Sequence, residues 1–177
     1  MACNLTSAIA LSCIDSIGGL KVAYIGVNVV IASTSYDANN QITGMTGTTG
    51  SFFEYELPKD TASFTETFNI SNTNGTAFYD QAITINVQKL TAEKRNQLLL
   101  LSRNRDIKVI FQDNNDNYWL MGKTRGGVIS AGTSVTGKAL GDANGYNITF
   151  QALEQNPMSA LSGTLSSVAT GITVQSN

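Results

Sequence analysis

Several stretches of this chain alternate apolar and polar residues at every second position, and that pattern most constrains its fold. It is regular in residues 63–71, 83–88 and 146–153, where Ile, Phe and other apolar residues alternate with Thr, Asn and Gln. A period of two sends successive side chains to opposite faces of a β-strand, so each stretch predicts a strand with one buried face. The pair Asn74-Gly75, between the first two stretches, is a strong signal for a tight turn.

Two further segments extend the β pattern. Residues 21–31 (KVAYIGVNVVI) are nearly continuous and β-branched, which favours a strand buried on both faces or a hairpin broken near Gly26. Residues 108–112 (KVIFQ) and 118–122 (YWLMG) flank the turn-rich sequence 113–117 (DNNDN), which predicts a second hairpin. Most of the chain is therefore expected to be β-sheet.

One helix is expected between these strands. Thr91 can act as its N-cap, and residues 92–103 (AEKRNQLLLLSR) contain only good helix formers. The apolar block 98–101 is wider than a single stripe, so the helix is expected to pack across a sheet. Its cationic side chains mark either a surface that faces a partner or a solvated one; they are Lys94, Arg95 and Arg103.

Composition narrows the functions open to such a chain. Its 177 residues are enough for one ordinary domain. It contains no His, which removes the catalytic triads, general bases and most zinc sites that depend on imidazole. With 11 Lys and Arg against 13 Asp and Glu, its net charge of −2 argues against binding of nucleic acid by charge neutralisation. No apolar run approaches the roughly 18 residues that indicate a membrane span.

No motif for catalysis, a cofactor or a metal stands out. Asp113, Asn115 and Asn117 match the first ligand positions of a calcium loop, but Tyr118 replaces its turn glycine and Thr124 its closing glutamate. A hairpin turn is the better interpretation of these residues.

Three segments raise separate questions. Glu66 falls on the apolar face of residues 63–71, which requires a place at the sheet rim, a bulge that shifts the register, or a cation at an interface. Residues 32–50 are almost all small and polar, and predict a long surface loop or a polar extended hairpin. Residues 158–177 carry no charge and are mainly Ser, Thr, Gly and small aliphatics, which indicates an arm rather than a second core.

The low charge content indicates a surface that other subunits cover. Charged residues make up 14% of the chain, against about 25% in typical soluble domains. Neutral polar groups lose less hydration energy than Lys or Glu when a partner covers them, although an extracellular domain rich in Thr and Asn would show the same composition. A face that contacts copies of itself, or borders a channel for a polyanion, is expected to be neutral. The outward positions of three predicted strands are neutral in this way: Thr65, Thr67, Asn69, Thr84, Asn86, Gln88, Asn147, Thr149 and Gln151.

Charge is also divided along the chain. Residues 1–88 contain two cations and seven anions, whereas residues 89–177 contain nine cations and six anions, so the halves carry −5 and +3. A dipolar subunit of this kind suits head-to-tail association, while a basic helix that is simply solvated would account for the same numbers.

Over roughly residues 52–157 the sequence resembles the structural proteins of tailed bacteriophages, particularly tail tube and tail-ring subunits. The strand AITINVQ is followed by a helix that begins TAEKRNQLL, then by IKVIFQDNNDNYWLMG and TGKALGDANGYNITFQALEQNP. The resemblance implies a β-sandwich or half-open barrel with one flanking α-helix. That domain would span residues 21–157, with extended arms at residues 1–20 and 158–177 that lock neighbouring subunits. The family has no catalytic, cofactor-binding or metal-binding residues to carry over.

The same resemblance implies assembly. Members of the family form rings, usually sixfold, around a channel for DNA, and contact other tail or neck proteins of a virion that is assembled in the host cytoplasm. Segment 32–50, with Ile42 and Met45, is similar to the loop that contacts the next ring. The expected function is a self-assembling, non-enzymatic tail tube or tail-ring subunit. The acidic face of strand 51–57, with Glu54 and Glu56, is expected to line the channel so that DNA slides without sticking.

A second hypothesis belongs to another class. A capsid decoration protein, or a surface β-sandwich that binds a glycan or a host protein, would also be mainly β and rich in Thr and Asn. The Ser- and Thr-rich sequence after Met158 leaves this open, together with a place in a neck ring. Exposed aromatic side chains in a shallow groove, such as Tyr118 and Trp119, would favour it.

Overall fold

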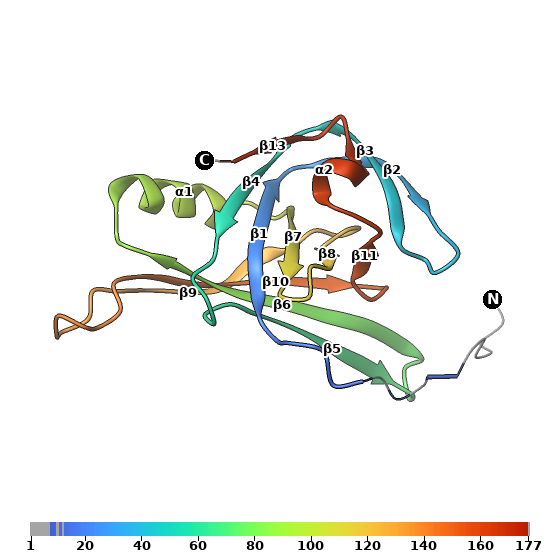
Figure 1. The fold of residues 1–177 in the computed structure, drawn as a ribbon, viewed down its shortest axis with the longest axis horizontal. Helices are drawn as coiled ribbons and strands as arrows, with labels where there is room; N and C mark the ends of the chain where they lie inside the picture. Colours follow the sequence, from blue (N-terminus) through green and yellow to red (C-terminus); the bar gives the residue numbers. More distant parts are fainter. Residues whose placement is uncertain (1–7, 10, 12, 177) are drawn as a thin grey trace.

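Two β-sheets pack against each other, with a helix at their flank (Figure 1). The fold is that of a computed structural model, which describes residues 8–9, 11 and 13–176, without the side chains of residues 47–49. The mainly β fold with a flanking helix that the sequence predicts is confirmed. The elements are β1 (Leu20–Val27), β2 (Val30–Tyr36), β3 (Ile42–Thr49), β4 (Ser51–Glu56), β5 (Ser63–Ser71), β6 (Thr76–Gln88), α1 (Ala92–Ser102), β7 (Ile107–Asp113), β8 (Tyr118–Met121), β9 (Val128–Val135), β10 (Gly145–Glu154), β11 (Ser159–Leu161), α2 (Leu165–Val168), β12 (Ala169–Thr170) and β13 (Thr173–Gln175).

The smaller sheet has the strand order β5-β6-β10-β9, and every neighbouring pair is antiparallel. Gly75 adopts a φ of 64° in the turn between β5 and β6, as the Asn-Gly signal predicts. Ile83 and Phe150 point inward, as the alternation predicts, and are fully buried. They belong to a cluster that includes Val109 and Phe111 of the other sheet, which we call the sandwich core.

The larger sheet has nine strands and curls into a half-barrel. Its order is β12-β3-β11-β8-β7-β1-β4-β13, with β2 paired to β3. Strand β1 has a core on each side, but its burial is complete on only one of them, where Ala23 and Ile25 lie, and Tyr24 on the other side is half-buried. The predicted segment 21–31 is interrupted at Asn28 (φ 52°), and the hairpin alternative is wrong because β1 pairs with β4 and β7 while β2 pairs with β3. Ile25 faces the sandwich core. On the other side of the sheet Ile110, Leu120 and Phe52 belong to a second cluster, which we call the barrel core.

The C-terminal segment closes this half-barrel, so the prediction of an arm without a second core is wrong. Strand β11 pairs with β8 and β3, β12 pairs with β3, and β13 pairs with β4 at the other end of the sheet. Leu161, Leu165 and Val168 are buried in the barrel core. Because these apolar residues are spaced among Ser, Thr and Gly, neither a helical nor a strand period marks them in the sequence.

Residues 32–50 form most of the β2–β3 hairpin, so the extended hairpin is correct and the loop is not. Asp37 shapes its turn, since its Oδ1 accepts hydrogen bonds from the backbone N of Asn39 at 2.9 Å and of Gln41 at 2.8 Å. The prediction that Ile42 and Met45 belong to a self-association loop is wrong. Their side chains are 0% and 1% exposed in the barrel core, where no second subunit reaches them.

Helix α1 begins where the sequence predicts. The hydroxyl of Thr91 accepts a hydrogen bond from the backbone N of Lys94 at 3.2 Å. Leu101 is buried and Leu98 packs against the sandwich core, whereas Leu99 and Leu100 are exposed. The wide apolar block is thus only half covered by the protein's own sheet.

Candidate functional site

All nine neutral residues predicted for an interface lie on one face of the four-stranded sheet. Thr84 of β6 is opposite Thr149 of β10, and Asn86 is opposite Asn147. Thr65 of β5 is aligned with Gln151 through Ala82, which pairs with both strands. The opposite face carries the sandwich core, so these residues point away from it. We call this surface, formed by the outward residues of β5, β6, β10 and β9, the open face.

The open face carries almost no charge. Asp80 is the one charged residue among the outward positions of the four strands. Its carboxylate oxygens accept hydrogen bonds from the Gln151 amide at 2.8 and 2.9 Å. The hydroxyls of Thr84 and Thr149 lie 3.0 Å apart and hydrogen-bond to each other. The face is therefore neutral, and several of its polar groups already bind one another.

Apolar side chains that were not predicted for this face lie among these polar groups. Phe78, Val128, Val135 and Leu153 are each 40–45% exposed. Phe78 belongs to β6, which is longer than the predicted strand 83–88. If the alternation is extended from Ile83 toward the N-terminus, Phe78 falls on the open face. The sequence therefore contains the pattern that places this residue. Partly exposed apolar groups in a neutral face are typical of the centre of a protein interface.

The four-stranded sheet also has two open edges. Within the described chain, β5 and β9 are its end strands, with nine and eight residues. Because each neighbouring pair is antiparallel, β5 and β9 run in opposite directions. Joining β9 of one copy to β5 of another would continue the antiparallel order of the sheet. Open edges of this kind are templates for pairing with another chain.

The three cations predicted to form a basic surface on the helix lie in three different surroundings. Lys94 is used inside the chain, since its Nζ donates to the backbone O of Gln88 at 2.6 Å. Arg103 is exposed at the C-cap of α1. Arg95 stands beside a groove of about 370 Å³ between α1 and the inner side of β9 and β10, which we call the α1 groove. Its apolar lining consists of Leu98, Leu99, Ile129, Tyr146 and Ile148.

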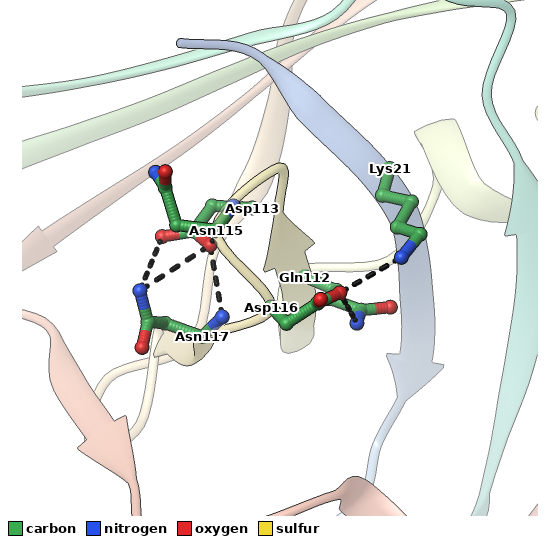
Figure 2. A network of polar contacts seen from close by, with 6 residues as sticks. All are labelled: Lys21, Gln112, Asp113, Asn115, Asp116 and Asn117. Atoms are coloured by element: carbon green, nitrogen blue, oxygen red, sulfur yellow. Dashed lines mark hydrogen bonds and ion pairs between the residues drawn. The ribbon is translucent and has the colours of Figure 1, made fainter. Parts of the chain in front are cut away.

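The β7–β8 turn is built by its own side chains, as the hairpin interpretation predicts. Oδ1 of Asp113 accepts hydrogen bonds from the backbone N of Asn115 at 2.9 Å and of Asn117 at 2.8 Å. Figure 2 shows this turn beside Lys21 of β1. The Asp113 carboxylate is thus occupied by the turn.

The same turn holds the chain that leads into β1. The amide of Asn115 donates to the backbone O of Ile17 at 2.8 Å and accepts from the backbone N of Ile17 at 2.9 Å. The Asn114 amide donates to the backbone O of Gly18 at 2.7 Å. We call these two asparagines the turn clamp. Their side-chain amides bond to the backbone of Ile17 and Gly18 as the backbone of a neighbouring strand would. These bonds set the direction in which the chain before Ile17 leaves the sheet.

An exposed ion pair lies next to the clamp. Nζ of Lys21 is 2.8 Å from Oδ1 of Asp116, which also accepts from the Gln112 amide at 2.8 Å (Figure 2). The hydrogen bond and charge of Lys21 hold the pKa of Asp116 below its ordinary value of 3.8. The same contact raises the pKa of Lys21.

Glu54 and Glu56, predicted to line a channel, lie on β4 in the half-barrel sheet. Glu54 is opposite Tyr24 and half-buried, and Glu56 is opposite Val22 and exposed. Burial raises the pKa of Tyr24, and the charge of Glu54 adds to this effect. Both carboxylates are therefore separated from the open face by the two-sheet packing, and they could line a channel only if the half-barrel sheet rather than the open face surrounded it.

Tyr118 and Trp119 do not form an exposed aromatic groove. Tyr118 packs against the barrel core, and Trp119 packs against the sandwich core. The indole Nε1 of Trp119 donates to Oδ2 of Asp113 at 3.1 Å. The feature that would favour a glycan-binding or host-binding surface is absent at these two residues.

Glu66 is bound by neutral partners. Its Oε1 accepts from Nε2 of Gln81 at 2.9 Å and from the backbone N of Met158 at 2.8 Å. The pairing of β5 with β6 is continuous, so the predicted bulge is absent, and within the described chain neutral groups rather than a cation bind this carboxylate. Gln81 is 1% exposed, and its Oε1 accepts from the backbone N of Gly122 at 3.1 Å. The network connects the two sheets.

A small polar cavity lies beside this network. Gln81, Lys123 and Glu154 line about 30 Å³, which is room for one or two waters. Oε1 of Glu154 already accepts hydrogen bonds from the backbone N of Thr124 and Arg125 at 2.9 and 2.8 Å. Over residues 8–9, 11 and 13–176 no group of three or more acidic, His or Cys side chains could hold a metal ion. In the same residues, no helix has the length and apolarity to cross a membrane.

Comparison with known proteins adds no relative. No protein-family model, curated protein or solved structure matches this chain.

Proposed function

We propose that this protein is a structural subunit of a tailed-phage virion that assembles with copies of itself into a ring or tube around a channel for DNA. The observation that carries the proposal is the open face. Four strands present neutral polar and apolar side chains with one carboxylate among them, and that carboxylate is bound by Gln151. A freely solvated sheet face ordinarily carries Lys and Glu, whereas a face that contacts copies of itself or borders a channel for a polyanion is expected to be neutral.

The two free edges supply a route to ring closure. The β9 edge of one copy would bind the β5 edge of the next by backbone hydrogen bonds, and every further copy would add in the same sense. Head-to-tail contacts of this type close into a ring when the rotation per subunit divides a full turn. The opposite charges of the two halves of the chain favour the same arrangement.

Edge pairing would also decide what faces the channel. The inner side of the four-stranded sheet is filled by the sandwich core and the half-barrel. In a ring built from this sheet, the open face would surround the lumen, and Glu54 and Glu56 would lie outside it. A neutral lining offers DNA phosphates no cation to bind, so the polyanion passes without adhering.

Imaging and light scattering of the purified full-length protein test this proposal. We expect rings or tubes by negative-stain electron microscopy and a mass well above one subunit by light scattering. Thr65→Lys in the open face is expected to reduce assembly at least about tenfold, because every copy would place a cation on the same face of the ring and these like charges repel one another. Thr43→Lys, on an exposed position of β3, is the matched control.

A monomer at high concentration, with no ring in either measurement, would overturn the proposal. Rings that tolerate Thr65→Lys as well as Thr43→Lys would leave assembly in place but remove the open face from it.

A further inference from the structure

The sequence contains two Asn-Gly pairs, and the structure places them in different surroundings. Asn74-Gly75 belongs to the β5–β6 turn, and Asn144-Gly145 leads into β10. Before a glycine, the carbonyl carbon of an asparagine side chain is easily reached by the next backbone N, because glycine has no Cβ in the way. That attack displaces the side-chain amide, so each pair is a candidate for chemical modification.

The β5–β6 turn leaves Asn74 free to react. Asn74 and Gly75 are both exposed, and within the described chain a Cβ at Gly75 would meet no atom beyond its chain neighbours within 4 Å. Among the same residues, the Asn74 side chain and the backbone N of Gly75 form no hydrogen bond, and the backbone N of Asn74 donates to Oγ of Ser71 at 3.3 Å. The side chain can therefore rotate toward Gly75, and water reaches both groups.

The second pair is held in place. Oδ1 of Asn144 accepts a hydrogen bond from the backbone N of Leu90 at 3.0 Å, which fixes the side chain. Gly145 is buried and pairs with β6 on one side and β9 on the other. A Cβ at this glycine would overlap the backbone O of Val87. Ring closure requires both residues of the pair to rotate, and this packing opposes it.

We propose that Asn74 is a site of spontaneous deamidation, which converts it to aspartate and isoaspartate in the folded protein while Asn144 stays intact. The backbone N of Gly75 gives its proton to water and attacks Cγ of Asn74. The new C–N bond closes a succinimide ring, the bond from Cγ to Nδ2 breaks, and the side-chain nitrogen takes up a proton and leaves as ammonia. Water then opens the ring, at Cγ to give aspartate or at the backbone carbonyl carbon to give isoaspartate. No group is oxidised or reduced, and the reaction does not depend on the proposed function.

Conversion changes the charge and the backbone at one end of the four-stranded sheet. Residues 63–88, which form the β5–β6 hairpin, contain Glu66 and Asp80 but no Lys or Arg. A carboxylate at residue 74 therefore adds an anion that no cation of the hairpin can neutralise. Isoaspartate also adds the side-chain methylene to the main chain, so the turn that Gly75 closes at a φ of 64° changes its geometry. Figure 1 shows this turn at the end of the hairpin that lies far from α1.

Peptide mapping of the full-length protein tests the proposal. The protein is kept at mildly alkaline pH, which favours loss of the backbone proton, once folded and once unfolded in guanidinium chloride. Trypsin then releases the two pairs in separate peptides, residues 60–89 and 139–177, and mass spectrometry measures the conversion of each asparagine. In the folded protein we expect Asn74 to convert at least about tenfold faster than Asn144. In the unfolded chain, where nothing holds either pair, the two rates are expected to differ by less than about threefold.

Gly75→Ala is the matched variant. Its Cβ obstructs the approach of the backbone N, so conversion of Asn74 is expected to slow at least about tenfold, both in the folded protein and in guanidinium chloride. The rate at Asn144 in the same sample reports whether the variant is folded. Equal rates at the two asparagines of the folded wild-type protein, or a faster rate at Asn144, would overturn the proposal. An Asn74 that reacts in guanidinium chloride but not in the folded protein would overturn it as well.

Discussion

The two sheets of this protein differ in how much of their surface the chain itself covers. The half-barrel sheet packs against a core on each side, the sandwich core on one and the barrel core on the other, although most of β2 and the Phe53 side chain stay exposed. Strands β12 and β13 of one short C-terminal segment pair with β3 and β4 toward its two ends. The four-stranded sheet keeps one face and two edges uncovered within the described chain. Any assembly of this protein is therefore expected to use the four-stranded sheet, and the half-barrel is expected to supply most of the stability of the single subunit.

Removal of residues 158–177 is expected to have the largest effect on stability, because it opens the half-barrel that the chain itself closes. The deletion takes Leu161, Leu165 and Val168 out of the barrel core, and each buried aliphatic side chain contributes about 1.5–3 kcal/mol. The sum is comparable to the stability of a whole domain, about 5–15 kcal/mol, so we expect the truncated protein to be unfolded by circular dichroism. Removal of residues 1–16 is the control and is expected to change the urea midpoint little. A truncated protein with an unchanged midpoint would show that the segment does not close the half-barrel.

Substitution of two adjacent phenylalanines compares how much each face of β4 contributes to stability. Phe52 is 0% exposed in the barrel core, whereas Phe53 is 53% exposed. Phe52→Ala is expected to lower the free energy of unfolding by about 3–5 kcal/mol, through lost burial and the cavity left behind. Phe53→Ala is expected to cost less than about 1 kcal/mol. Urea denaturation of the two variants measures this difference, and equal losses would contradict the existence of a second core.

Gln81 tests how the two sheets are joined. Gln81→Leu leaves the buried backbone N–H of Gly122 without its acceptor, which is expected to cost about 1–3 kcal/mol. Gln88→Leu, at an exposed position of the same strand, is expected to stay within about 0.5 kcal/mol of the wild type. The free energy of unfolding from urea titrations checks both values. A neutral Gln81→Leu would mean that apolar packing alone holds the sheets together.

The smallest effect is expected at the Lys21–Asp116 pair, because both side chains are exposed. Lys21 lowers the pKa of Asp116, so the pair contributes stability at pH values above 3.8 and loses it as the pH falls through the lowered pKa. Lys21→Met is expected to raise the pKa of Asp116 toward 3.8, as measured by an NMR titration of its carboxyl carbon. An unchanged pKa would show that the pair does not form in solution.

Local patterns predict much of this fold. The alternation in β5, β6 and β10 correctly placed Ile83, Phe150 and the nine outward residues, since a strand side chain has only two directions to choose from. The caps and turns at Thr91, Gly75 and Asp113 followed from hydrogen bonds between residues close in the chain. The register of β6 with β10 then brought the separate polar rows onto one face.

Other features depend on pairs of residues far apart in the chain. Ile42 and Met45 were misplaced because their segment is polar at most other positions, and the β2–β3 hairpin packs its few apolar side chains against Leu120 and Leu161. The turn clamp joins residues 98 positions apart, and no local rule connects Asn115 to Ile17.

The sequence by itself determined the strands β5 and β10, the second half of β6 and the β7–β8 hairpin, which side of their residues faces outward in β5, β6 and β10, and where α1 begins, because these depend on neighbours within a few positions. Only the tertiary structure decided that the C-terminal segment closes a half-barrel, that a second core exists, and that one whole face of the four-stranded sheet stays uncovered by the described chain. Such outcomes depend on which strands pair across long separations, and sparse apolar residues such as Leu161 and Val168 become a core only when that pairing brings them together.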